Sequence, residues 1–214
     1  MRLCVILTLG VLALGGVADA QSTAPDAGPT YVEGVAHSAF GNVTSQSYGL
    51  EAGRLVRPRL TVFGEFGQVA DVSTSGLGDA AGVIARALAQ IQSGVSYSVA
   101  EPVNFFAGGV KYTLSSAGKL QPYALGGFGL ASAKKDVVYN VDNSDVTSRL
   151  DGYGVVLGSD LSGSASHVMF VVGAGATLPI RGRLFADLQF RLNRIFADEA
   201  ISIGRAGLGL GIRF

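Results

Sequence analysis

The chain has 214 residues, of which 31 are glycine and 15% are charged, whereas about 25% charged residues is usual in a soluble domain. Its 16 basic residues are scattered and balance 16 acidic ones, which excludes the basic footprint of a nucleic-acid-binding protein. Cys4 is the single cysteine, so neither a disulfide framework nor a cysteine metal site is expected.

The first residues have the features of a secretory signal peptide. Arg2 precedes an uncharged apolar run at 5–17, and Ala18, Asp19 and Ala20 give the small-x-small pattern that signal peptidase cleaves. The apolar run is shorter than the roughly 20 residues that a transmembrane helix needs. The sequence therefore predicts a cleaved signal peptide at 1–20, followed by a short periplasmic tail at 21–30 and one domain at 31–214.

Segments of strand length fill this domain. After the signal peptide the chain lacks the roughly 18 uninterrupted apolar residues of a transmembrane helix, and a closed barrel is the other architecture that satisfies the backbone in lipid. The candidate strands are 31–44, 46–56, 60–72, 102–114, 120–133, 167–178, 184–196 and 201–214. They predict an all-β fold, a single transmembrane antiparallel up-and-down β-barrel of eight strands. Ten strands are the alternative, if part of 92–99 pairs with part of 137–141.

The connections alternate between short and long, as outer-membrane barrels require. Short ones at 57–59, 115–119 and 179–183 are expected at the periplasmic end, and the longest outer ones are 73–101 and 134–166.

The first long loop contains apolar residues at helical spacing. They are Ala80, Ile84, Ala87, Leu88 and Ile91. With Gly78 and Asp79 as a cap, they predict a short amphipathic helix over 79–92. We favour a helix that packs on the barrel rim over one that rests on lipid headgroups, because Arg86 is its only basic residue.

The second long loop, 134–166, is rich in Asp, Asn, Ser and Gly. Its aspartates lack the spacing of a calcium-binding loop, so we expect a solvated loop and no metal.

Charged residues of one parity are predicted to face the lumen, because a charge facing lipid at the midplane costs a few kcal/mol. They are Glu33, Glu51, Glu65, Lys111, Asp187, Arg191, Arg205 and Arg213. An eight-stranded barrel has room inside for side chains only. We therefore expect these charges to pair and to plug the lumen.

The last strand alternates strictly and ends on an aromatic residue. Ala206, Leu208, Leu210, Ile212 and Phe214 share one face, while glycines and arginines share the other. This strand, together with 48–53 (YGLEAG) and 122–129 (PYALGGFG), resembles the small outer-membrane barrel superfamily that contains opacity-type proteins and the OmpA-like membrane domain.

The resemblance covers 31–214 and implies insertion by the outer-membrane assembly machinery, with Leu208, Leu210, Ile212 and Phe214 as the recognition signal. The expected location is the outer membrane of a Gram-negative cell, in contact with lipid and lipopolysaccharide. Arg194, near the outer end of its strand, is a candidate to bind lipopolysaccharide phosphate or, alternatively, to hydrogen-bond neighbouring loops. No further domain follows Phe214 in this sequence, so peptidoglycan binding is not implied.

The sequence offers little support for catalysis. His37 adjoins Ser38 and His167 adjoins Ser166, but neighbours in a strand point to opposite faces. A G-x-S-x-G elbow is also missing. We therefore predict no catalytic residue, no cofactor and a non-enzymatic barrel that supports the envelope or binds an external partner through loop 134–166. The alternatives are a narrow, porin-like solute channel, a soluble calycin-like carrier with the faces reversed and, less favoured, a lipid acyl hydrolase.

Overall fold

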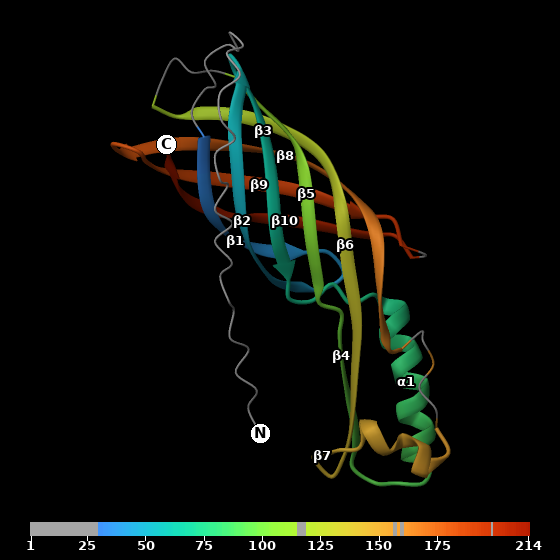
Figure 1. Ribbon diagram of the computed structural model, residues 1–214. Coiled ribbons are helices and arrows are strands. Elements are labelled where there is room, and N and C mark those ends of the chain that lie inside the picture. Colours follow the sequence, from blue (N-terminus) through green and yellow to red (C-terminus); the bar gives the residue numbers. More distant parts are fainter. Residues whose placement is uncertain (1–29, 115–118, 156–157, 159–160, 198) are drawn as a thin grey trace, which may run out of the picture.

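The computed structural model describes residues 30–114, 119–155, 158, 161–197 and 199–214 (Figure 1). Eight antiparallel strands form a closed ring, in which each strand pairs with its neighbours and β1 pairs with β10. The ring consists of β1 (Thr30–Phe40), β2 (Thr44–Arg57), β3 (Leu60–Val69), β5 (Val103–Thr113), β6 (Gln121–Val141), β8 (Gly163–Arg181), β9 (Leu184–Ile195) and β10 (Ile201–Arg213). The predicted eight-stranded antiparallel barrel is confirmed. The predicted signal peptide and tail lie outside the described residues.

Two further strands, β4 (Val95–Ala100) and β7 (Ser144–Asp145), lie outside the ring. β4 pairs with residues 136–141 of β6, beyond Lys135, where the pairing of β6 with β8 ends. The segments named in the ten-strand alternative therefore do pair, but they do not enlarge the barrel.

Several strand boundaries differ from the prediction. The first strand ends at Phe40, and Thr44 begins the second. β6 continues to Val141 and β8 begins at Gly163, so the prediction that 134–166 is a solvated loop was wrong. The strand predicted at 120–133 ends before Lys134, yet the pairing of β6 with β8 continues through Lys134 and Lys135. Charged residues are tolerated there because that part of the strand lies past the apolar belt.

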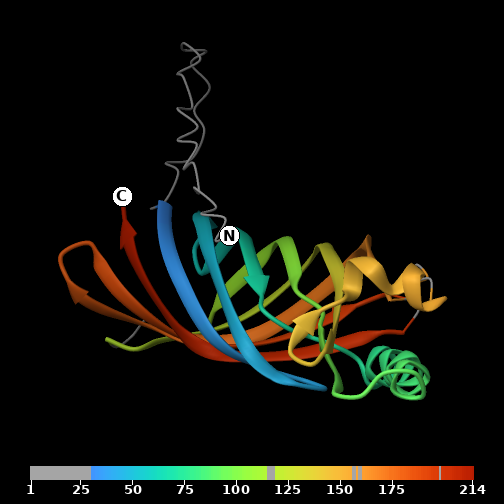
Figure 2. The same cartoon turned by 90° about the horizontal axis from the view of Figure 1, so that it is seen from below.

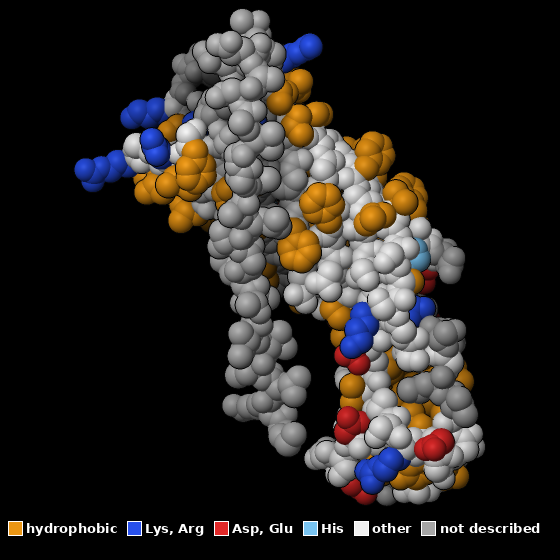
Figure 3. All heavy atoms as spheres, in the orientation of Figure 1, with side chains coloured by type: hydrophobic (Ala, Val, Ile, Leu, Met, Phe, Trp, Pro, Cys, Tyr) orange, Lys and Arg blue, Asp and Glu red, His pale blue; other side chains and the backbone are white. Residues whose placement is uncertain are grey.

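The two faces of the barrel have opposite chemistry. Leu208 and Phe128 are 62% and 66% exposed on the outer face, where apolar side chains form a belt around the strands (Figure 3). The inner face contains buried charged side chains. A soluble carrier would require the opposite arrangement, so the calycin-like alternative does not fit this structure.

Helix α1 (Ser75–Ala89) begins four residues before the predicted start at 79. Thr74 is the N-cap, and its Oγ1 accepts a hydrogen bond of 3.3 Å from the Leu77 backbone N–H. A hydroxyl can satisfy a free N–H of the first turn, which Gly78 cannot do, and this explains the earlier start. The buried stripe also differs from the predicted one, because Ala87 and Ile91 are exposed.

α1 packs within what we call the loop subdomain, composed of α1, β4, residues 136–141 of β6, β7 and the 3₁₀ helix η1 (Thr147–Tyr153). Its core consists of Leu77, Ala81, Ala85, Leu88, Val137, Tyr139, Val141, Val146, Leu150 and Leu161. Figure 2 shows α1 end-on at one side of the barrel strands. The apolar stripe of the helix therefore packs on the extension of the barrel wall. In the described part of the chain, neither helix is long and apolar enough to cross a bilayer.

Candidate functional site

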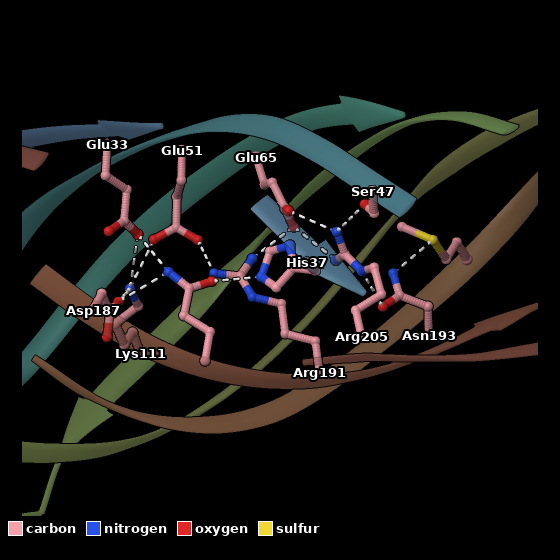
Figure 4. Close-up of polar contacts among 12 residues, drawn as sticks. Glu33, His37, Ser47, Glu51, Glu65, Lys111, Asp187, Arg191, Asn193 and Arg205 are labelled. Atoms are coloured by element: carbon pink, nitrogen blue, oxygen red, sulfur yellow. Dashed lines mark hydrogen bonds and ion pairs between the residues drawn. The ribbon is translucent and has the colours of Figure 1, made fainter. Parts of the chain in front are cut away.

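The lumen is filled by a network of buried ionic side chains from strands on opposite sides of the ring (Figure 4). Each comes from an inward-facing position, so the alternation of the strands alone brings them together. Glycines on the same face leave room for them. A Cβ atom at Gly209 would lie 2.8 Å from Glu33 Oε2, which supports a packing role for this glycine.

Glu65 on β3 accepts hydrogen bonds from two arginines across the lumen. Arg191 Nη1 donates to Glu65 Oε2 at 2.6 Å, and Arg205 donates to both carboxylate oxygens at 2.9 and 3.1 Å. Arg205 also donates to Asn193 Oδ1 and lies 4.5 Å from the ring centroid of Phe105. The two-pronged arginine–carboxylate bond fixes both partners in one geometry.

A second cluster surrounds Glu51 on β2. Its carboxylate accepts hydrogen bonds from Arg191, from the Tyr31 hydroxyl and from Lys111 Nζ, the last at 2.7 Å. Arg191 thus bridges Glu51 and Glu65 and joins the two clusters. Loss of this bridge would leave four buried carboxylates facing only two buried cations, Lys111 and Arg205, and therefore an excess of negative charge inside the barrel.

The third cluster contains Glu33 and Asp187. Gln189 Nε2 donates to both carboxylates at 3.0 Å, and Lys111 Nζ lies 3.7 and 3.6 Å from them. Tyr123 donates its hydroxyl to Asp187 at 2.9 Å. Glu33 Oε2 and Asp187 Oδ1 are buried without a hydrogen-bond partner in the structure. His37 Nδ1 and Arg191 Nε, elsewhere in the network, are likewise buried without a partner.

Apolar side chains close the lumen toward the loops. They occupy inward positions at the loop ends of several strands and are Ala39, Val69, Val103, Ala131, Ala133, Met169, Val171, Ile195, Ile201 and Ile203. All are buried. The lumen thus consists of a charged section and an apolar section.

The other residues singled out from the sequence lie elsewhere. Arg213 faces the mouth of the lumen at the turn end, the end with the short connections and the C-terminus. It forms no ion pair with a described residue, contrary to the expected pairing; it donates to Gln121 Oε1 at 3.3 Å, and its guanidinium lies 5.0 Å from the Phe185 ring centroid. Arg194 is exposed and donates to Ser202 Oγ. Leu208, Leu210, Ile212 and Phe214 are on the outer face.

A cavity of about 480 Å³ lies at the loop end, between the first turn of α1 and the extended wall of β6 and β8. Another of about 420 Å³ lies at the turn end, lined by Tyr31, Tyr123 and Phe185. Both have the size of small-molecule sites, and the buried network lies between them.

Glu101 lines the first cavity and lies between β4 and β5, where the loop subdomain joins the barrel. The Asp71 carboxylate accepts hydrogen bonds of 2.9 Å from the backbone N–H groups of Ser73 and Glu101. The Glu101 side chain itself is buried, and this burial raises its pKa, while Lys135 opposes the shift. Asp71 thus links the two ends of segment 73–101, which contains α1 and β4, through these hydrogen bonds.

The histidines form no recognisable catalytic unit. His37 Nε2 hydrogen-bonds to Gln189 Oε1 at 3.2 Å inside the lumen, and His167 lines the cavity beside α1. Among the described residues, no serine hydroxyl hydrogen-bonds to either histidine, and no cluster of three or more His, Cys, Asp or Glu side chains has metal-binding geometry.

Sequence reasoning placed Gln189 and Asn193 inward together with the charged residues, but it missed Tyr31, His37, Ser47 and Tyr123. All four have inward parity. Their alternation with outward residues was the signal that identifies them.

No protein-family model and no curated protein sequence matches the chain. Solved structures do match its fold. Neisserial surface protein A is 13% identical, with a TM-score of 0.57 over 87% of this chain and 97% of that one. The N-terminal barrel domain of Pseudomonas aeruginosa OprF is 17% identical, with a TM-score of 0.53 over 88% and 99%.

A major outer membrane protein of Thermus thermophilus is 11% identical, with a TM-score of 0.55 over 87% and 99% of the two chains. At these identities the likeness concerns the fold alone. The chain therefore has the fold of the small outer-membrane β-barrels, as the resemblance of its sequence predicted.

Proposed function

We propose that the protein is a non-enzymatic integral outer-membrane barrel with a sealed lumen, which presents its loop subdomain to the outside. The outward apolar belt and the fold shared with outer-membrane barrels support this location. The ends of the barrel then follow the usual topology, with the turn end in the periplasm and the loop end outside.

The buried ionic network is the observation that carries the sealed lumen. Arg191, Glu51 and Glu65 join opposite walls and are fully buried, and apolar side chains fill the section above them. A conducting path requires water-filled space at this level. The network instead ties opposite walls of the barrel together, which suits a structural part of the envelope.

The loop subdomain is the part we assign to an external partner. It has its own buried core and stands beyond the barrel strands (Figure 1). A preordered surface binds a partner with little loss of conformational entropy. We place the partner site on the described residues of 134–166 together with α1.

Single-channel recording in planar bilayers tests the sealed lumen. The protein is expected to show no steps at any voltage after insertion is verified by the gel shift of the folded form. An Arg191→Ala/Glu65→Ala variant serves as the comparison, because it removes two bonded side chains from the network that fills the lumen. Steady conductance of the unmodified protein would overturn the sealed lumen.

A narrow channel for small solutes is the second candidate. The cavities of about 480 and 420 Å³ at the two ends of the lumen favour it, since they shorten the barrier between the two sides. If this candidate is correct, conductance appears without any substitution and increases in the double variant.

We further propose that the protein is inserted by the outer-membrane assembly machinery through its last strand. The apolar side chains of Leu208, Leu210 and Ile212 on β10, and of Phe214 directly after it, are exposed. Replacement of Phe214 by Ser should lower the amount of folded protein in the outer membrane, whereas Phe196→Ser, at an exposed site outside β10, should have a smaller effect.

A further inference from the structure

The charges of the described residues are divided among three zones along the barrel. The buried network contains four acidic and three basic side chains. The loop end contains eight acidic residues and five basic ones, namely Asp71, Asp79, Glu101, Asp136, Asp142, Asp145, Asp151 and Glu199 against Arg86, Lys134, Lys135, Arg149 and Arg194. At the turn end, every charged side chain of the described residues outside the buried network is basic.

The exposed ones form what we call the basic collar. It consists of Arg54, Arg57, Arg59, Lys119, Arg181 and Arg183. Arg213 is not counted, because it is half-buried and lines the cavity at the mouth of the lumen. None of the collar residues forms an ion pair with an acidic side chain of the described residues, in contrast to the buried cations. Figure 3 shows Lys and Arg side chains projecting at this end.

The collar adjoins the edge of the apolar belt. Arg57 follows Val56 on β2, and Arg181 follows Ile180 on β8; both apolar side chains are about half exposed. Exposed Leu114, Leu120 and Phe214 continue this edge around the barrel. Long basic side chains at such a boundary keep their stems on apolar surface and extend their charge to the headgroup level.

We propose that the basic collar binds the phosphate groups of anionic phospholipids in the leaflet at the turn end. This inference rests on the proposed location in a membrane. An excess of cations without acidic neighbours attracts phosphate, and guanidinium binds it through paired N–H groups. The ring-like distribution around several strands and the contact with the apolar belt favour a lipid surface over a single acidic peptide.

The test uses membrane-extracted protein reconstituted in phosphatidylcholine vesicles, with spin-labelled phosphatidylglycerol or phosphatidylcholine as the reporter. The fraction of immobilised label gives the relative association of the two lipids with the barrel. We expect phosphatidylglycerol to be preferred about threefold at 50 mM salt, and the preference to decrease at 500 mM salt.

The variant Arg57→Gln/Arg181→Gln/Arg183→Gln should lose most of this preference. The matched control, Arg86→Gln/Lys134→Gln/Arg149→Gln, removes the same charge at the loop end and should retain it. Folding of each variant is checked independently by its gel mobility before and after boiling.

Three results would contradict the inference. Equal association of both lipids with the inserted protein overturns it and leaves the membrane location intact, as does an unchanged preference in the collar variant. Collar-dependent binding of a labelled polyglutamate peptide without any lipid preference assigns the collar to an acidic peptide instead. Failure to insert into any vesicle rejects the proposed function itself.

Discussion

The side chains in the lumen and those in the core of the loop subdomain are both buried, but different interactions stabilise them. In the lumen, large ionic side chains such as Arg191 and Arg205 form bonds from wall to wall. In the loop subdomain, apolar side chains of α1 pack on those of β4 and β6, and the buried hydroxyl of Tyr139 donates to the Ala81 carbonyl at 3.2 Å. Burial raises the pKa of this hydroxyl to about 12.

The difference follows from what surrounds each core. The barrel has lipid outside, so its apolar side chains face outward and its polar ones must satisfy each other inside. The loop subdomain has water outside and buries its apolar side chains as any soluble domain does. One chain thus contains a lumen with a charged section and a separate, mainly apolar core in the loop subdomain, and damage to one should leave the other intact.

The largest expected effect comes from the lumen variant Arg191→Met. It leaves Glu51 and Glu65 buried without their bridging cation, which should lower the free energy of unfolding by about 3–5 kcal/mol. The measurement incubates the lipid-inserted protein at increasing urea concentrations and follows the folded fraction by its gel mobility. Arg194→Met, on the exposed face of the same strand, is the control and should cost less than about 1 kcal/mol. If Arg191→Met lowers the free energy of unfolding no more than Arg194→Met does, the ionic network contributes little to stability.

Leu88→Ala tests whether the second core is separate. Removal of this fully buried side chain should destabilise the loop subdomain by about 2–5 kcal/mol. Hydrogen exchange of α1 should then become faster while the urea midpoint of the barrel stays the same. The control is Val83→Ala on the exposed face of the helix. A parallel fall in the barrel midpoint would mean that the two cores unfold together.

Thr74→Ala should have a smaller, local effect. It removes the side-chain acceptor for the Leu77 N–H, and loss of such a cap costs about 1 kcal/mol. Faster hydrogen exchange in the first turn of α1 is the expected readout. Ser75→Ala, one residue later, provides the comparison; if it has the same effect, the cap hydroxyl is not the cause.

The smallest effect is a pH dependence at Glu101. Burial raises its pKa above the ordinary value near 4.5, with Asp71 and Glu199 acting in the same direction and Lys135 opposing them. Its folded pKa is therefore above the unfolded one, so its contribution is fully present below pH 4.5 and is lost as the pH rises through the folded pKa.

We expect the melting temperature of α1, followed by circular dichroism, to fall between pH 4 and pH 7 more in the unmodified protein than in Glu101→Gln. The same slope in both would remove Glu101 as the titrating group. The collar variant of the lipid experiment extends the comparison to a third, fully exposed zone.

The barrel was predictable because lipid imposes a strict period of two. Every strand had to place apolar side chains outward, and this alone identified the inward positions of Glu33, Glu51 and Glu65, which are far apart in the sequence. Their pairing geometry was not predictable, because it depends on the register among β1, β2 and β3 and on which cations of the facing strands reach them.

The loop subdomain was predicted only in part, through its helix and the alternative pairing of 92–99 with 137–141, for the opposite reason. Past the apolar belt, a strand such as the end of β6 has water on one side and a small core on the other, and its pattern resembles that of a solvated loop. One local signal was available. Asp142 and Asn143 have positive φ values of 48° and 62°, a backbone conformation that Asp and Asn adopt more readily than most residues, and they form the turn between β6 and β7.

Separation of cell membranes, followed by gel electrophoresis of the extracted protein with and without boiling, tests the central claim most directly. The account predicts that the protein is found in the outer membrane and that boiling changes its mobility, because the closed barrel resists detergent until heated. A protein released in soluble form from the periplasm, with the same mobility before and after boiling, would contradict it.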